Sequence, residues 1–267
     1  MFDWFNQKDK NKEFKLWQMS ESQKFYYARY LGLVGMISIN LDTAISYLTK
    51  SINILDKLED DASNHSLKFN LISHISALHM FLGNITLAEK FLKKIEELAK
   101  QGIIQEADLF IIYLLKSALF NIQGKYNEAL ECIDKMIKIF NDPHINDPYF
   151  TGAYMLRAQI LNSLDRYQEA YIQAQQVYNI HKHIKNENNE IFANVYIKMA
   201  RSELGLGKVD KASEYINKAI PILLADENRN PEVINYSKDS HLAVGYVVQG
   251  TLIRDKNYNS YPELGVI

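Results

Sequence analysis

The side chains most often used in catalysis and metal binding are scattered along this chain. Its seven histidines lie at positions 65, 74, 79, 144, 181, 183 and 241. His181 and His183 are two residues apart and His74 and His79 are five apart, so neither pair would share one face of a helix as chelating ligands must. No HExxH, GxSxG or phosphate-loop motif occurs, and Cys132 is the only cysteine. The sequence therefore predicts no catalytic residue, no metal site and no cofactor, and a protein that is not an enzyme.

The feature that organises the chain is a short motif written five times. It consists of a turn residue, one free position, an apolar residue, two further positions and an alanine. The alanines lie 44, 41, 41 and 42 residues apart. Each repeat has the pattern of two consecutive amphipathic helices. A motif that recurs at such a period in a helical chain predicts a helical solenoid. The full copies begin at Gly83, Gly124, Asp165 and Gly207 and end at Ala88, Ala129, Ala170 and Ala212, and a first copy without the glycine covers Asn40 to Ala44.

Helix signals divide the chain into five helix pairs and one final helix. Ser20 with Gln23 three positions later forms a capping box, which starts the first helix. Gly102 is expected to end a helix, and Pro143 and Pro148 are expected to form the clearest loop. We expect a flexible lead at 1–19, a solenoid at 20–254 and a non-helical tail at 255–267. The expected helices are 20–37, 42–59, 64–82, 84–101, 104–122, 125–140, 149–164, 166–184, 190–206, 208–225 and 228–254, the last of which would cap the array.

Composition narrows the class of protein further. The chain of 267 residues carries a net charge of −2, is 47% hydrophobic and contains 5 prolines. This charge argues against nucleic acid as the partner, and the apolar content argues against disorder. No apolar run reaches the ~20 residues that a membrane span needs, and the N-terminus lacks a secretory signal pattern. A single cysteine fits a reducing compartment, so a cytoplasmic location is expected.

Registered on its alanines, the chain resembles the tetratricopeptide repeat (TPR) family over residues 25–225. In that motif small residues let the two helices of a pair approach closely, a turn residue reverses the chain, and an aromatic residue fills the gap between neighbouring pairs. The resemblance implies an all-α, right-handed helical solenoid. It rests on positions 4, 8, 11, 15, 17, 20 and 24, which read Tyr113, Ser117, Phe120, Gly124, Tyr126, Ala129 and Ile133 in the third repeat and Tyr154, Ala158, Leu161, Asp165, Tyr167, Ala170 and Ala174 in the fourth.

Two departures from the usual pattern refine the resemblance. The period of 41–44 residues exceeds the usual 34 of the family by about two helical turns. Proline also does not end most of the repeats. The chain is therefore most similar to the long TPR repeats of the kinesin light chain, of LGN-type scaffolds and of the bacterial Rap and PlcR peptide receptors.

The resemblance also implies where a partner would bind. In TPR solenoids the first helix of each pair lines a concave groove, and a fixed set of its positions points into that groove. The set carries amide, apolar and basic side chains and no acid, so it could hold a peptide backbone through amides and acidic groups through cations. Carried over residue by residue, the implied binding residues are Arg29, Tyr30, Asn70, His74, Asn121, Met155, Gln159, Asn162, Asn194, Lys198 and Arg201.

Three functions remain open on this basis. The first is a non-enzymatic adaptor or scaffold that binds a segment or helix of a partner protein, acidic in character, in the concave groove. The second is a bacterial peptide-signal receptor, although residues 1–19 are too short for the effector module such receptors carry. The third is a structural subunit or secretion-type chaperone, in which the final helix could mediate homo-oligomerisation.

Overall fold

The computed structural model describes residues 16–38, 40–59, 61–101, 106–139, 150–182, 190–224 and 243–252. The regular structure within these ranges is entirely helical, as the sequence predicts. Contacts divide the chain into two compact units, Met1–Ile103 and Ile104–Ile267. Gly102, Pro143, Pro148, most of the expected N-terminal lead and the expected tail fall outside the described residues. The division into two units is a feature that the regular repeat pattern did not indicate.

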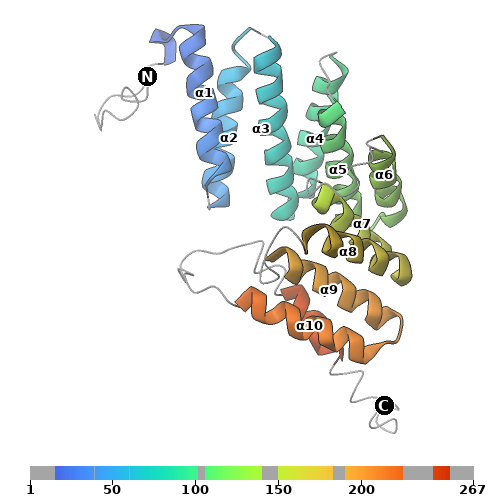
Figure 1. Cartoon of the computed structure of the whole chain (residues 1–267). Helices are drawn as coiled ribbons and strands as arrows, with labels where there is room; N and C mark the ends of the chain where they lie inside the picture. The colour runs from blue at the N-terminus through green and yellow to red at the C-terminus, as the bar shows by residue number, and fades with distance from the viewer. Residues whose placement is uncertain are drawn as a thin grey trace. The chain divides into compact units, whose positions relative to one another are not determined.

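Unit 1 contains two helix pairs (Figure 1). A 3-10 helix, η2 (Leu16–Gln18), precedes α1 (Glu21–Met36), α2 (Leu41–Leu55), α3 (Ala62–Phe81) and α4 (Ile85–Lys100). The predicted capping box at the start of α1 is present: the Gln23 backbone N–H donates to Ser20 Oγ, and the Ser20 N–H donates to Gln23 Oε1. The helix α1 packs on α2, α3 on α4, and the first helices of the two pairs, α1 and α3, also contact each other.

Unit 2 contains three further pairs and the C-terminal helix. Its pairs are formed by α5 (Glu106–Ile122) with α6 (Tyr126–Ile139), α7 (Thr151–Ser163) with α8 (Tyr167–His181), and α9 (Glu190–Gly205) with α10 (Val209–Leu224). The first helices of these pairs, α5, α7 and α9, contact one another in that order. They therefore form one continuous helical face, the arrangement that the TPR register requires.

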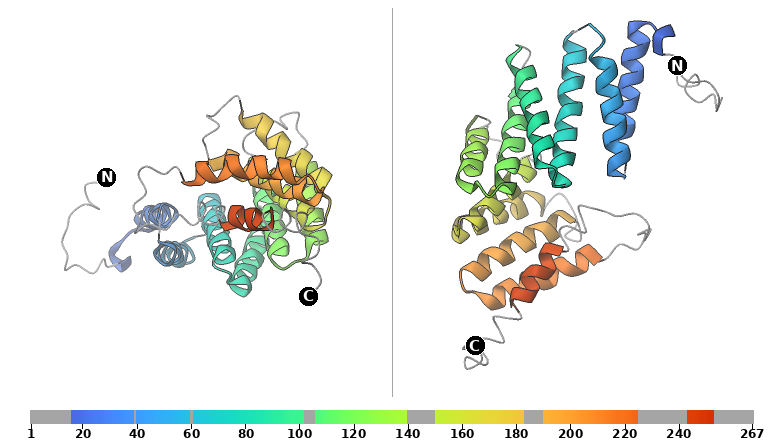
Figure 2. Two further views of the ribbon diagram at one scale, coloured as in Figure 1. Left: turned by 90° about the horizontal axis from the view of Figure 1, so that it is seen from below. Right: turned by 180° about the vertical axis from the view of Figure 1, so that it is seen from behind.

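The helix of residues 243–252 covers the last pair, as predicted for a capping helix. Val248 and Leu252 are buried in the core cluster that α9 and α10 share. A methyl group placed on Gly245 would lie within 3.7 Å of Ile197 on α9 and Ile220 on α10. Figure 2 shows this helix, in red, lying against the α9–α10 pair. Its expected beginning near residue 228 falls outside the described residues.

The turn within each of the second to fifth pairs uses the left-handed backbone conformation. Gly83, Gly124 and Gly207 each have a φ of 74°, and Asp165 takes the same place in the fourth repeat with a φ of 58°. This region favours glycine because a Cβ atom crowds the backbone there, and aspartate is among the few other residues that enter it. The turn residue of the motif therefore has a conformational cause, and Gly207 serves a turn rather than a phosphate loop.

Small residues hold the two helices of each pair together. The motif alanines at 44, 88, 129, 170 and 212 are all buried. The hydroxyl of Ser76 donates to the carbonyl oxygen of Ala88 at 3.0 Å, and that of Ser117 donates to the carbonyl of Ala129 at 2.8 Å. A serine on the first helix therefore adds a buried hydrogen bond between the two helices. An alanine at that position would allow the same close approach without the hydrogen bond.

None of the described helices is long and apolar enough to cross a membrane.

The ring of Tyr167 packs between neighbouring pairs and contacts Gly205 directly. A Cβ atom at Gly205 would lie 2.4–2.5 Å from three atoms of this ring. The tyrosine cannot move aside freely because its hydroxyl also donates to the carboxylate of Asp165. Position 17 of the motif therefore does what the sequence predicts, and the glycine at the end of α9 makes room for it.

Replacing Gly205 with alanine should lower stability by about 1–2 kcal/mol. The clash with Tyr167 overpacks the contact between the pairs, which outweighs the gain in helix propensity from losing a glycine. Chemical denaturation followed by circular dichroism would measure the change. Gly152→Ala is the matched control because a Cβ there meets nothing within 4 Å, so its stability should stay equal or rise slightly. Equal stabilities for the two variants would contradict the packing role of Gly205.

Candidate functional site

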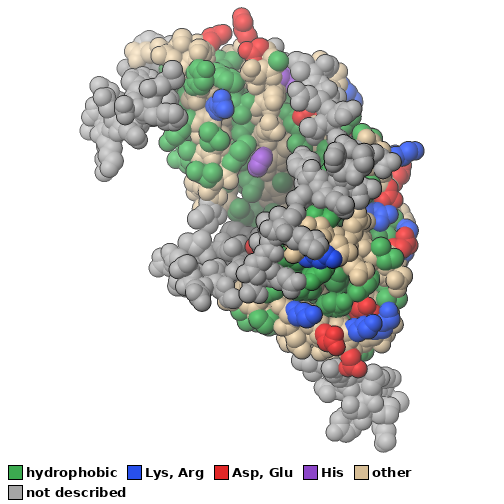
Figure 3. Space-filling view, in the orientation of Figure 1, with side chains coloured by type: hydrophobic (Ala, Val, Ile, Leu, Met, Phe, Trp, Pro, Cys, Tyr) green, Lys and Arg blue, Asp and Glu red, His purple; other side chains and the backbone are tan. Residues whose placement is uncertain are grey.

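Unit 1 presents four of the predicted binding residues on α1 and α3. Arg29, Tyr30, Asn70 and His74 are all exposed. His74 Nδ1 lies 2.9 Å from the carbonyl oxygen of Asn70 one turn earlier, which fixes the orientation of its ring. Figure 3 shows apolar side chains gathered over α1 and α3. The exposed apolar residues are Tyr26, Tyr30, Leu33 and Met36 on α1 and Ile37 directly after it.

Unit 2 brings three of the predicted residues together across α7 and α9. Lys198 Nζ on α9 donates to Gln159 Oε1 on α7 at 2.7 Å. Arg201 follows Lys198 by three residues and is exposed. The pKa of Lys198 is lowered from 10.5 to about 8, mainly by desolvation of the Lys198 ammonium group and to a smaller extent by repulsion from Arg201. Two cations thus stand near each other, and no described carboxylate offsets the charge of Lys198.

Two predicted binding residues belong to the packing of unit 2. Met155 is 7% exposed and lies in the hydrophobic core cluster that α9 and α10 also build. Asn162 is 2% exposed, and its amide links α7 to α9: Ser202 Oγ donates to Asn162 Oδ1 at 3.0 Å, and Asn162 Nδ2 donates to the carbonyl of Lys198. The groove position assigned to these two residues is therefore corrected, because neither offers an open side chain to a partner.

The remaining amides, Asn121 on α5 and Asn194 on α9, have unused hydrogen-bonding capacity. The Oδ1 atom of each is buried and has no hydrogen-bond partner within the part of the chain that the structure describes. A buried acceptor without a donor costs about 1–3 kcal/mol, so it is a rare feature in a folded chain. Both residues are only partly buried as a whole. Together with Gln159, they place one amide on each of α5, α7 and α9.

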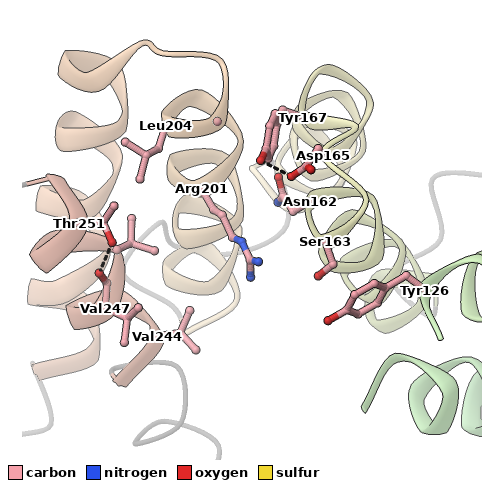
Figure 4. A pocket seen from close by; sticks show the side chains of 12 residues that line it. Tyr126, Asn162, Ser163, Asp165, Tyr167, Arg201, Leu204, Val244, Val247 and Thr251 are labelled. Carbon is pink, nitrogen blue, oxygen red and sulfur yellow. Dashed lines mark hydrogen bonds between the residues drawn. The ribbon is translucent and has the colours of Figure 1, made fainter. Parts of the chain in front are cut away.

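A cavity of about 480 Å³ opens at one end of this face (Figure 4). It lies between the end of α7 with its following turn, the second half of α9, and the helix of residues 243–252. The guanidinium of Arg201 points into it, between that helix on one side and Tyr126 and Ser163 on the other. The residues that line it are Tyr126, Asn162, Ser163, Asp165, Tyr167, Arg201, Leu204, Gly205, Val244, Val247, Val248 and Thr251.

Most of these lining residues were not among the binding residues predicted from the sequence, although two features of the sequence pointed to them. Tyr126 and Tyr167 occupy the aromatic position of the motif, which predicts a ring between neighbouring pairs. Val244 and Val247 lie on the final helix, which has apolar residues on more than one side. What the sequence could not provide is the position of that helix over α9, because no repeat register extends to it.

The cavity lining has a clear charge asymmetry. Arg201 has no acidic partner among the described residues, whereas Asp165, the one carboxylate that lines the cavity, accepts a hydrogen bond from the hydroxyl of Tyr167. That hydrogen bond raises the pKa of Tyr167, which stays a neutral donor. The site therefore offers the Arg201 cation beside an apolar wall, while the Tyr167 hydroxyl occupies one oxygen of the Asp165 carboxylate.

The described histidines differ in their surroundings. His74 is exposed, whereas His79 is buried and stacks on Phe91 with ring centroids 5.4 Å apart. Burial lowers the pKa of His79, as expected for a ring held against an apolar neighbour. Among the described residues, no group of three or more His, Cys, Asp and Glu side chains could hold a metal ion.

Comparison with known proteins adds evidence on the fold. No family model matches the sequence. The HTH-type transcriptional regulator MalT of Vibrio cholerae is 24% identical over 162 residues, which cover 59% of this chain and 17% of that protein. MalT of Vibrio parahaemolyticus is also 24% identical, over 72% of this chain and 21% of its own length. The matched region thus spans about a fifth of these relatives.

Solved structures identify the class of fold. The chain is similar to NprR in complex with its cognate peptide NprX, with a TM-score of 0.64 and 16% identity over 94% of this chain and 68% of that one. It is also similar to BtubC from P. vanneervenii, with a TM-score of 0.58 and 16% identity over 82% of this chain and 92% of that one. Together with the helix pairs, the turns and the small-residue contacts, these similarities establish a TPR-type repeat fold.

Proposed function

We propose that the protein is a non-enzymatic TPR scaffold that binds a segment of a partner protein across the first helices of its repeats. The observation that carries the proposal is the row of amides on α5, α7 and α9, two of which have a buried oxygen without a donor. Side-chain amides can bond the N–H and C=O groups of an extended peptide without demanding one sequence. The similarity to a peptide-bound structure, NprR, supports this use of the fold.

The cations on α9 would set the preference for the partner. Lys198 and Arg201 carry positive charge on the same face as the amides, and the described first helices of unit 2 place no acid beside Lys198. An acidic segment would gain charge-assisted hydrogen bonds there, which are about twice as strong as neutral ones. Affinity would be spread over several repeats and would weaken with added salt.

Replacing the three amides Asn121, Gln159 and Asn194 with alanine should weaken partner binding at least about tenfold, since each loses bonds worth about 1 kcal/mol. Partners would be captured from native lysate on the immobilised wild type, identified, and then titrated against both proteins. The matched control replaces Asn127, Gln175 and Asn217, three exposed amides on the second helices α6, α8 and α10.

The comparison decides which helical face the partner uses. Binding that the first triple variant loses and the control triple variant keeps would support the proposal. The reverse result, or equal binding by both folded variants, would move the interaction to the second helices or the termini and would overturn the proposal.

A peptide-sensing role is the second candidate, favoured by the similarity to NprR with its cognate peptide and to the transcriptional regulator MalT. The chain would then hold a short free peptide rather than a segment of an intact protein. Native mass spectrometry of the protein purified from its own source would separate the two, because only a sensor would carry a peptide of small mass.

Location and assembly are further parts of the proposal. A cytoplasmic location fits the single cysteine. Self-association would use the outer side of the helix of residues 243–252, where Tyr246 is 48% exposed. Sedimentation equilibrium over a range of concentrations would detect it.

A further inference from the structure

The cavity beside Arg201 has an unusual combination of walls. On one side the helix of residues 243–252 contributes Val244, Val247 and Val248, and α9 contributes Leu204. Val247 is 70% exposed, a high value for an aliphatic residue that faces a concave surface. This wall can bury one aliphatic or aromatic side chain of a ligand, which would stabilise a complex by about 1.5–3 kcal/mol.

The opposite side of the cavity presents donors. The Arg201 guanidinium has five N–H donors and no acidic partner among the described residues, and the hydroxyl of Tyr126 faces it across the cavity (Figure 4). The Ser163 hydroxyl donates its one proton to the Gln159 carbonyl at 3.2 Å, so it is not a donor to the cavity. The one lining carboxylate, Asp165, keeps its negative charge and accepts a hydrogen bond from the Tyr167 hydroxyl. An anion would therefore find its donors at Arg201 and Tyr126.

We infer that this cavity binds an apolar carboxylate, with the carboxylate on Arg201 and the side chain against the valines. A planar guanidinium pairs with a carboxylate through two parallel hydrogen bonds, which fixes its direction as well as its charge. The volume of about 480 Å³ accommodates one or two residues of a peptide. The two sources of such a group are the C-terminal residue of a peptide and a free small carboxylic acid. The inference rests on the proposed function only in placing a peptide on this face.

Calorimetric titration with a small set of probes tests the inference. The first probe is N-acetyl-leucyl-leucine, the second is its C-terminal amide, and the third is N-acetyl-diglycine. We expect the leucine acid to bind at least about tenfold more tightly than either of the others, since one lacks the charge and the other lacks the side chain. A longer peptide ending in the same two leucines separates the sources: equal or tighter binding indicates a peptide end, and weaker binding indicates a free small acid.

Two variants assign the binding to the cavity. Arg201→Gln should lose at least about tenfold in affinity for the leucine acid, whereas Arg166→Gln, the same substitution at an arginine outside the cavity that pairs with Glu169, should not change it. Val247→Asp, at an exposed position that leaves the fold intact, should abolish binding by opposing the ligand charge.

The inference is overturned if acid and amide bind equally, if Arg201→Gln binds like the wild type, or if the leucine acid shows no heat of binding up to its solubility. Its failure is distinct from that of the proposed scaffold. A protein partner that still binds Arg201→Gln but is lost from the triple amide variant would keep the scaffold and remove the cavity ligand.

Discussion

Replacing Phe192 with alanine should destabilise the protein by about 3–5 kcal/mol, the cost of removing a fully buried aromatic ring. Phe192 is 0% exposed and lies on α9 at the centre of the larger core cluster of unit 2. Its ring meets that of Tyr178 on α8 edge to face, with centroids 5.6 Å apart, and also contacts Tyr196. Edge-to-face pairs add about 0.5–1.5 kcal/mol beyond the burial itself.

Two control variants separate the effect of the space left in the core from the general effect of shortening a side chain. Phe192→Leu keeps most of the volume and should cost about 1–2 kcal/mol, and Ile172→Ala, at a residue that is 55% exposed on α8, should change stability by less than about 0.5 kcal/mol. Urea unfolding followed by circular dichroism would give the three values. A change below about 1 kcal/mol for Phe192→Ala would show that α8 and α9 close over the lost volume.

Hydrogen exchange on Phe192→Ala would also report how the chain unfolds. In a repeat array each pair is held mainly by its neighbours, so damage at the contact between α8 and α9 should loosen that contact first. We therefore expect the amides of α8, α9 and α10 to lose protection before those of α3 and α4, which belong to the other compact unit.

Much of the fold could be predicted because the repeat motif encodes local requirements. A left-handed turn needs glycine or a substitute such as Asp165, and two helices in close contact need a small residue such as Ala129. Each requirement recurs at the same register, so five helix pairs follow from the spacing of the alanines. The division into two units, which falls between Ile103 and Ile104, could not be predicted because the motif specifies nothing at these positions.

The candidate site was predicted less completely, for a physical reason that Asn162 illustrates. A groove position in the register says which way a backbone position points, but not whether the next helix lies close enough to bury the side chain. The amide of Asn162 is hydrogen-bonded to Ser202 and to the carbonyl of Lys198, and Met155 is buried in the core. Gln159 lies on α7 and Lys198 and Arg201 lie on the adjacent α9, and their use by a partner stays a prediction.

Replacing Lys198 with methionine should stabilise the protein at neutral pH by about 2 kcal/mol. Burial lowers the pKa of this lysine to about 8 in the folded protein, against 10.5 for an exposed lysine. Below pH 8 the ammonium is charged in both the folded and the unfolded chain, and the folded state carries the full cost, about 3 kcal/mol. Methionine removes this cost but leaves Gln159 Oε1 without its donor, which returns about 1 kcal/mol.

The pH dependence gives a sharper test than the stability at one pH. Between pH 8 and pH 10.5 the unfolded chain binds a proton at Lys198 that the folded chain does not, so the stability of the wild type should rise with pH across this window. Other groups also titrate there, so the quantity to measure is the difference between wild type and Lys198→Met in urea unfolding at each pH. That difference should favour methionine by about 2 kcal/mol below pH 8 and should reverse above pH 10.5, where the wild type keeps the hydrogen bond to Gln159, worth about 1 kcal/mol. The exposed Lys211→Met variant should show no comparable difference.

The cost of burying Lys198 links the stability of the free protein to the proposed function. An anionic partner placed beside Lys198 and Arg201 would raise the pKa of Lys198 again, because it offsets the desolvation and the repulsion between the two cations. Binding of an acidic peptide above pH 8 should therefore take up a proton, which calorimetry in buffers of different ionisation enthalpy would measure, and Lys198→Met should bind the peptide without this uptake. If Lys198→Met is instead less stable than the wild type at pH 7, the ammonium group is not strained in the free protein, and the face of α7 and α9 is not a site prepared for negative charge.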